Sequence, residues 1–163
     1  DKKIYNILFF LSGIKEIDEF LLERAIIVAK RLPKEKIFIK SHPILSLTKL
    51  KKIEYLPYNI IESFDTLDNM LEKTTNVISA GPTSAILECL IYNCNLIIYK
   101  VSIYEKILAK QIDLPKRLYK VINSDLELEK YIKKKKLIKK NFTKIKKKLF
   151  QPENKKNLNL FLT

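Results

Sequence analysis

The sequence predicts an α/β protein with a doubly wound parallel sheet, because short apolar runs alternate with segments of helical periodicity along most of the chain. The first run, residues 4–12, is apolar except at Asn6 and Ser12, which is typical of a strand that is buried on both faces of a parallel sheet. In residues 17–32, which follow, apolar side chains recur at helical spacing up to Pro33. A strand, a helix and a second strand make a right-handed crossover unit, and repetition of this unit gives a sheet with helices on both faces.

The remaining elements continue the same alternation. Further strands are predicted at residues 36–41, 76–80, 95–101 and 118–122, with a weaker one at 53–57. Four further helices are predicted: a short one that ends near residue 52, one that is capped by Ser63, and two at residues 83–93 and 104–111. A turn at Gly81 and Pro82 separates the strand at 76–80 from the helix after it. We therefore expect a Rossmann-like domain in residues 1–124.

The pattern changes after Ser124, and residues 125–163 are predicted to form a lysine-rich helical extension that packs on the domain. An amphipathic helix is expected here, because apolar residues step by four, three and four positions at Ile138, Phe142, Ile145 and Leu149. The net charge of +14 also gathers in this part of the chain. Residues 1–115 hold 16 basic and 14 acidic side chains, whereas residues 116–163 hold 16 and 4, a local charge of +12.

Composition excludes several classes of protein. No run of about 18 apolar residues is present, which argues against a membrane-spanning helix. Cys89 and Cys94 lack the paired spacing of a zinc site and are expected to be buried thiols. A nucleic-acid-binding module is an alternative suggested by the lysines, but aromatic residues are not interleaved with them. The chain starts at Asp1 rather than Met, and we interpret this as a cut within a longer protein.

The loop after the second predicted strand is the first candidate site, since ligands of open α/β sheets bind at the carboxyl ends of the strands. It contains His42, the only histidine of the chain, followed by Pro43. Proline biases the residue before it toward an extended conformation and so fixes how the imidazole is presented. A histidine here can hydrogen-bond a phosphate or a base edge. The alternative is a loop histidine without a function.

The turn and helix start after residues 76–80 form the second candidate site. Gly81 turns the chain, and Thr83 and Ser84 open a helix whose unpaired N–H groups favour a phosphate. Glu88 lies one turn after Ser84 and could accept hydrogen bonds from a ribose. The alternative is that the two hydroxyls only cap the helix while Glu88 lies at the surface.

Ser12 and Gly13, after the first strand, are the third candidates. One of only two glycines stands here, which suggests either close approach of the backbone to a ligand or a plain turn. Neither a Gly-x-Gly-x-x-Gly nor a Walker sequence is present, which argues against a dinucleotide oxidoreductase and a P-loop NTPase.

Taken together, residues 39–43 (IKSHP) and 79–88 (SAGPTSAILE) resemble two motifs in the C-terminal domain of GT-B glycosyltransferases. The resemblance is to bacterial capsule and surface-polysaccharide enzymes: polysialyltransferases, sialyltransferases, Kdo transferases and polyglycerolphosphate polymerases. It implies that His42 contacts the donor nucleotide, commonly CMP or CDP, that Thr83 and Ser84 hold its phosphate, and that Glu88 binds the ribose. The chain departs from this pattern by having Lys-Ser-His-Pro for Lys-Pro-His-Pro and by lacking a doubled serine.

The resemblance also implies the chemistry. We expect metal-independent glycosyl transfer without a cofactor, in which His42 stabilises the departing nucleotide phosphate. The base that activates the acceptor is expected on an N-terminal domain outside this chain, so the chain alone should be inactive. Cytoplasmic enzymes of this kind work beside an anionic leaflet, so we expect the lysine-rich end to attach to the inner face of the cytoplasmic membrane. A nonhydrolysing UDP-sugar 2-epimerase, which shares the fold and a similar His-Pro element, is the alternative enzyme.

Overall fold

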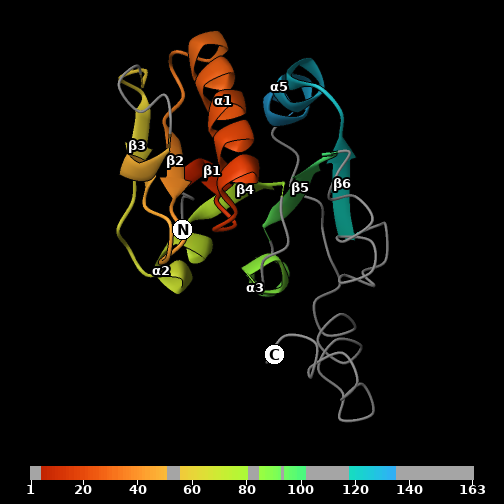
Figure 1. Cartoon of the computed structure of the whole chain (residues 1–163). Coiled ribbons are helices and arrows are strands. Elements are labelled where there is room, and N and C mark those ends of the chain that lie inside the picture. The colour runs from red at the N-terminus through yellow and green to blue at the C-terminus, as the bar shows by residue number, and fades with distance from the viewer. Residues whose placement is uncertain (1–4, 51–55, 81–84, 93, 102–117, 135–163) are drawn as a thin grey trace.

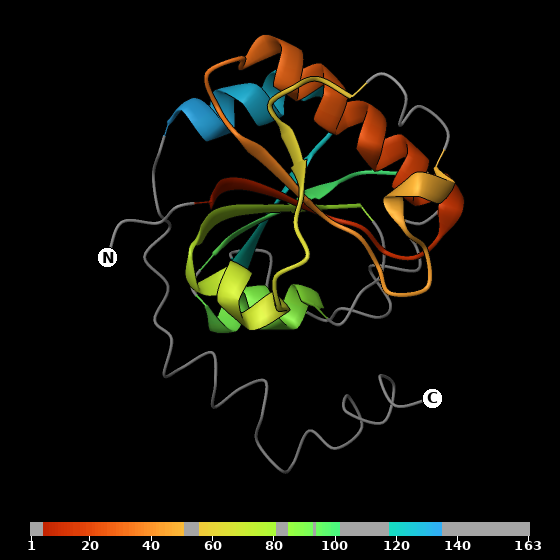
Figure 2. The ribbon, with the colours of Figure 1, turned by 90° about the vertical axis from the view of Figure 1, so that its left-hand side faces the viewer.

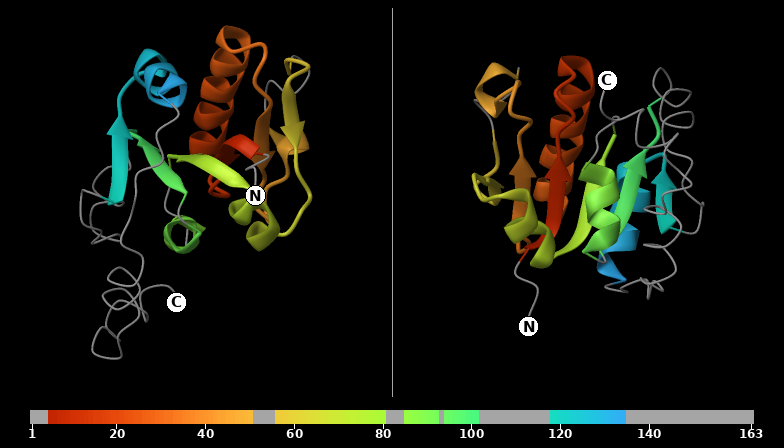
Figure 3. Two further views of the ribbon diagram at one scale, coloured as in Figure 1. Left: turned by 180° about the vertical axis from the view of Figure 1, so that it is seen from behind. Right: turned by 90° about the horizontal axis from the view of Figure 1, so that it is seen from below.

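The computed structural model describes residues 5–50, 56–80, 85–92, 94–101 and 118–134. These residues form a sheet of six strands, all paired in parallel, in the order β3-β2-β1-β4-β5-β6 (Figure 1). The strands are β1 (Tyr5–Phe10), β2 (Ile37–Lys40), β3 (Ile60–Glu62), β4 (Thr74–Ser79), β5 (Asn95–Tyr99) and β6 (Tyr119–Ile122). Strands are added on one side of β1 as far as β3 and on its other side from β4 onward, which confirms the doubly wound class (Figure 3).

Helices cover both faces of the sheet. They are α1 (Lys15–Arg31), the 3₁₀ helix η1 (Leu47–Lys49), α2 (Leu67–Glu72), α3 (Ala85–Ile91) and α5 (Asp125–Lys133). Figure 2 shows α1 and α5 together on one face, with α2 and α3 on the other. None of the helices in the described part of the chain is long and apolar enough to cross a bilayer.

The side chains of β1 and of Leu11, the residue after it, divide the core between these two layers. Ile7, Phe9 and Leu11 lie in the cluster under α1 and α5, whereas Leu8 and Phe10 lie in the cluster under α2 and α3. Four of the five are fully buried and Phe10 nearly so, and burial of each such side chain stabilises the fold by roughly 1.5–3 kcal/mol. The continuous apolar run at the start of the chain is explained by this two-sided burial.

The predicted third strand was misplaced. The strand β3 comprises residues 60–62, and residues 56 and 57 of the predicted stretch belong to no strand, while 53–55 lie outside the described residues. The buried amide of Asn59 fixes the start of β3, because it donates to the carbonyls of Ala29, Leu32 and Glu35 at the end of α1 and just beyond. These bonds join segments 24–30 residues apart, which local hydrophobicity does not reveal.

The predicted cap of the next helix was also wrong. Thr66, rather than Ser63, is the N-cap of α2, and its side chain accepts a hydrogen bond from the backbone N–H of Asn69. Ser63 still contributes its Oγ to a local bond from the N–H of Asp65. Both residue types cap helices well, so composition alone does not decide between them.

Cys89 and Cys94 are buried free thiols, as predicted.

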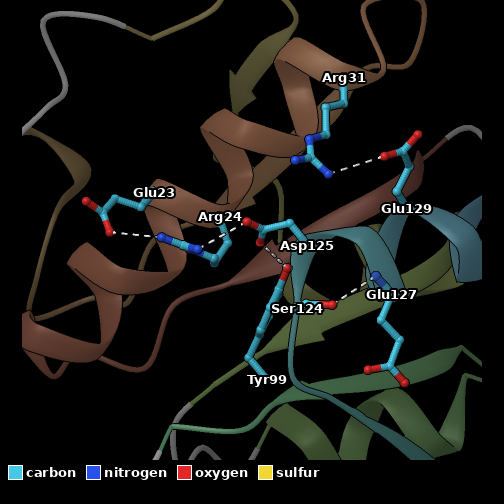
Figure 4. A network of polar contacts seen from close by, with 8 residues as sticks. All are labelled: Glu23, Arg24, Arg31, Tyr99, Ser124, Asp125, Glu127 and Glu129. Carbon is cyan, nitrogen blue, oxygen red and sulfur yellow. Dashed lines mark hydrogen bonds and ion pairs between the residues drawn. The ribbon is translucent and has the colours of Figure 1, made fainter.

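The helix α5, for which the sequence analysis gave no bounds, packs against α1. Leu128 and Ile132 are buried in the same cluster as the α1 side chains. Ser124 caps the helix by accepting from the N–H of Glu127. Figure 4 shows the polar contacts around this junction.

Two predicted helices lie outside the described residues: the amphipathic helix around residues 138–149 and the helix at 104–111. The domain boundary at residue 124 stays a prediction.

The carboxylate of Asp125 makes the central polar contacts of this junction between α1 and α5. It accepts a hydrogen bond from the Tyr99 hydroxyl at 2.7 Å and forms an ion pair with Arg24 of α1 at 3.1 Å. Burial and the bond to Asp125 raise the pKa of Tyr99, which keeps its hydroxyl a donor. The guanidinium of Arg24 also lies over the ring of Phe20, 5.1 Å from its centroid. The network therefore joins α1, β5 and α5.

Candidate functional site

The carboxyl ends of β1 and β4 lie side by side where the strand order reverses, which is the place where open α/β sheets bind ligands. The loop after β1 contains Ser12 and Gly13, and the loop after β2 contains His42 and Pro43. The predicted phosphate-binding residues Gly81, Thr83 and Ser84 lie outside the described residues, as does Pro82. The geometry of the site is therefore described for the β1 and β2 loops and for Glu88.

Gly13 and His42 are in contact. Gly13 has a φ of 85°, a left-handed conformation that side chains rarely adopt. A Cβ atom at this position would lie 2.7 Å from Nδ1 and 2.8 Å from Cγ of His42. The close approach that glycine permits here is thus an approach to the imidazole, and the structure brings two of the predicted site residues together across adjacent strands.

The loop of His42 is held by its own backbone. The carbonyl of His42 accepts from the N–H of Leu45 at 3.0 Å, and Nδ1 accepts a longer bond of 3.4 Å from the N–H of Ile44. A neutral imidazole that accepts at Nδ1 carries its proton on Nε2 and donates there. Nε2 has no hydrogen-bond partner among the described residues. Within the described part of the chain, the ring therefore has one donor that could bond a ligand.

Two bonds join the end of β2 and this loop to the end of β3 and the loop after it. Lys40 donates from Nζ to the carbonyl of Asp65 at 2.6 Å, and the hydroxyl of Ser41 donates to the carboxylate of Glu62. The lysine and serine that precede His42 thus fix two neighbouring loops to each other. Lys40 has a structural contact here, which its place in the Lys-Ser-His-Pro motif does not reveal.

Asp18, in the first turn of α1, is a residue of this region that the sequence analysis missed. Its fully buried carboxylate accepts from the N–H of Ser12 at 2.6 Å, the hydroxyl of Ser12 at 2.9 Å and the N–H of Gly13 at 2.9 Å. Burial raises the pKa of Asp18, while the bonds from Ser12 and Gly13 and the nearby His42 oppose the rise. An aspartate at the first turn of a helix, just after a strand, was the signal that could have indicated it.

These bonds also change the interpretation of Ser12 and Gly13. Their backbone N–H groups and the Ser12 hydroxyl all donate to Asp18, and the Ser12 Oγ accepts from the N–H of Ile14 at 3.3 Å. The loop is therefore bonded within the protein and contributes a fixed shape beside His42. Its contact with a nucleotide stays a prediction.

Glu88 is not joined to this cluster by any contact among the described residues. It is partly buried on α3, and burial, together with the negative charge of Asp68 on α2, raises the pKa of its carboxyl group. Ser79, at the end of β4, is fully buried, and its hydroxyl has no hydrogen-bond partner within the described part of the chain. No group of three metal-ligating side chains occurs among the described residues.

Neither a protein-family model nor a curated protein sequence matches this chain. Solved structures do match it. They include TarM, with 19% identity and a TM-score of 0.61 over 100% of this chain and 36% of TarM. They also include the calicheamicin glycosyltransferase CalG4 (10% identity, TM-score 0.57, 99% and 40%) and the glycosyltransferase SnogD from Streptomyces nogalater (12%, 0.54, 97% and 38%).

The fold is that of one α/β half of a GT-B glycosyltransferase. At these identities the likeness concerns the fold. The chain spans about two fifths of the length of each of these proteins. The loops that contain Gly13 and His42 follow β1 and β2 at the carboxyl edge of the sheet, the edge on which the sequence analysis placed its candidate residues.

Proposed function

We propose that this chain binds the sugar-nucleotide donor of a glycosyltransferase at the carboxyl edge of β1, β2 and β4. The observation that carries the proposal is the contact of Gly13 with the His42 ring, in the loops after β1 and β2 and beside the strand-order reversal. Nδ1 of this ring accepts from Ile44, and Nε2 has no partner among the described residues. The fold supports it, since the similar structures are glycosyltransferases. One of them, the S. aureus TarM G117R mutant, which matches with 18% identity and a TM-score of 0.57, was solved with UDP.

In the proposed reaction, His42 acts on the leaving group. An acceptor oxygen attacks the anomeric carbon of the donor sugar, the bond from that carbon to the phosphate oxygen breaks, and the nucleotide leaves with the electron pair. Negative charge grows on the phosphate as the bond breaks, and a donor such as His42 Nε2–H stabilises it. One such preorganised donor is worth roughly 10²–10³ in rate. Thr83, Ser84 and the N–H groups near Gly81 are proposed to bind the same phosphate, Glu88 the ribose, and no metal is required.

The nucleotide is proposed to be of the CMP or CDP type by resemblance of the two motifs, with UDP as the competing candidate. Capsule or other surface polysaccharide synthesis is the proposed context. The acceptor and the base that activates it are proposed to come from a second domain. We therefore expect residues 1–163 to bind a nucleotide without transferring sugar.

Titration of CMP, CDP, UMP and UDP into the chain, followed by calorimetry or NMR, is expected to reveal at least one ligand. His42→Ala should weaken its binding roughly tenfold or more, since a hydrogen bond to a charged group is lost. Lys130→Ala, an exposed change on α5, controls for unspecific attraction of an anion to a basic chain and should leave the affinity unchanged. Absence of any binding at millimolar nucleotide, or equal effects of both changes, would contradict the proposal.

We also propose that the lysine-rich extension of residues 125–163 attaches the protein to an anionic membrane surface. Each basic residue near such a surface contributes about 1 kcal/mol, and this part of the chain has a charge of +9, from 13 basic and 4 acidic side chains. The chain should sediment with vesicles that contain anionic lipid and should be released by salt. Equal sedimentation with neutral vesicles would contradict the electrostatic attachment.

A further inference from the structure

A fully buried carboxylate beneath the candidate site needs a physical reason, because removal of a charge from water is costly unless the charge is well bonded. Asp18 is 0% exposed. Both of its oxygens are occupied: Oδ1 accepts from the N–H and hydroxyl of Ser12, and Oδ2 accepts from the N–H of Gly13. Three donors from two consecutive residues make this carboxylate the anchor of the loop after β1.

This anchoring also affects the position of the His42 ring. Two successive N–H groups that point at one carboxylate fix the orientation of both peptide units, and the left-handed φ of Gly13 is part of that arrangement. The Cα of Gly13 then lies against the imidazole, so close that an added Cβ would meet Nδ1, Cγ and Cε1 within 3.2 Å. The position of the ring is therefore limited on one side by a backbone that Asp18 holds.

We infer that Asp18 is a positioning residue of the candidate site: it holds the Ser12–Gly13 backbone against the His42 ring and thereby sets the place of the Nε2 donor. The inference rests on the proposed function for its role in nucleotide binding. Asp18 does not itself contact the nucleotide, because its carboxylate is buried and bonded by the loop. It acts through Gly13.

The test uses Asp18→Asn in the full 163-residue chain. Asparagine keeps the size of the side chain and one acceptor, but places an NH₂ group where the carboxylate has its second oxygen, so the bond from Ser12 or from Gly13 is lost. We expect the Cε1–H resonance of His42 to shift in NMR spectra of the folded variant. We also expect nucleotide affinity to fall on the order of tenfold, the lower end of the loss seen when a residue that orients a metal-ligating side chain is replaced.

A double-mutant cycle separates positioning from mere stabilisation. If Asp18 acts through His42, Asp18→Asn should weaken nucleotide binding little further once His42 is alanine. If the loss of binding free energy in the double variant equals the sum of the losses in the two single variants, the inference is overturned. An unchanged His42 resonance in the folded Asp18→Asn protein would also overturn it.

Two further outcomes keep the inference separate from the proposed function. If the wild-type chain binds no nucleotide, the proposed function fails, and the His42 resonance alone decides whether Asp18 positions the ring. If Asp18→Asn does not fold, Ser12→Ala removes the hydroxyl bond to Oδ1 and the longer bond from the N–H of Ile14, and it leaves both backbone bonds to Asp18 in place. A shift of the His42 resonance in Ser12→Ala supports the inference, and its absence overturns it.

Discussion

Replacing Gly13 with alanine is expected to lower the free energy of unfolding by about 2–4 kcal/mol. Two costs add in this variant. The left-handed φ of 85° is strained for any residue with a Cβ, and the new methyl group would lie 2.7 Å from Nδ1 of His42. For a chain of this length the melting temperature should fall by roughly 4–16 °C, which thermal unfolding followed by circular dichroism measures.

A second substitution separates the two costs. In Gly13→Ala combined with His42→Ala the methyl group no longer meets the ring, while the strained φ remains, so the double variant should lose less stability than the sum of the single losses. Gly13→Ala should also weaken nucleotide binding, because the ring has to move. Strict additivity of the two stability losses would show that Gly13 and His42 are not in contact.

Asp125→Ala is expected to destabilise the protein by about 2–4 kcal/mol. The side chain of Asp125 is only 12% exposed, and its loss leaves the Arg24 guanidinium without its partner on α5 and the buried Tyr99 hydroxyl without its acceptor. Apolar contact of Leu128 and Ile132 and the half-exposed ion pair of Arg31 with Glu129 then remain to hold α5. Urea unfolding at equilibrium measures the loss, and amide exchange should show α5 opening before the sheet.

Lys133→Ala is the matched control on the same helix. Lys133 forms an ion pair with Glu129 at 2.6 Å, but its side chain is 61% exposed, and such surface pairs contribute about 0–1 kcal/mol. Similar losses in Asp125→Ala and Lys133→Ala would mean that the contacts of Asp125 with Arg24 and Tyr99 do not hold α5 in place.

The class of the fold could be predicted because its signals are local. A strand buried on both faces is apolar along most of its length, and a covering helix is apolar on one side, so both patterns can be recognised within a window of ten to twenty residues. The same local signals placed β1, β2, β4, β5 and β6 within a few residues of their observed bounds. They also singled out His42 and Gly13, each in the loop after a predicted strand.

Other features depended on partners that are distant along the chain. The start of β3 is set by Asn59, which bonds to carbonyls 24–30 residues away, and α5 is held by Asp125, which pairs with Arg24 101 residues away. The position of a polar residue in the sequence does not show whether the fold provides it with a buried hydrogen-bond partner. The sequence analysis therefore misplaced β3 and gave α5 no bounds.

The arrangement of the candidate site shows the same division. The sequence by itself determined that Gly13 and His42 follow strands, and hence that both lie at one edge of a parallel sheet. Only the tertiary structure decided that they touch, because the register of β1 with β2 sets Phe10 beside Lys40 and so brings the two loops to the same height. Asp18 shows the limit most clearly, since it is six residues from Ser12 and yet its role depends on how the loop folds back over the start of α1. The strands must pair and α1 must pack before the backbone N–H groups of Ser12 and Gly13 point toward the Asp18 carboxylate. For this reason the sequence alone did not show that this acidic residue anchors the loop.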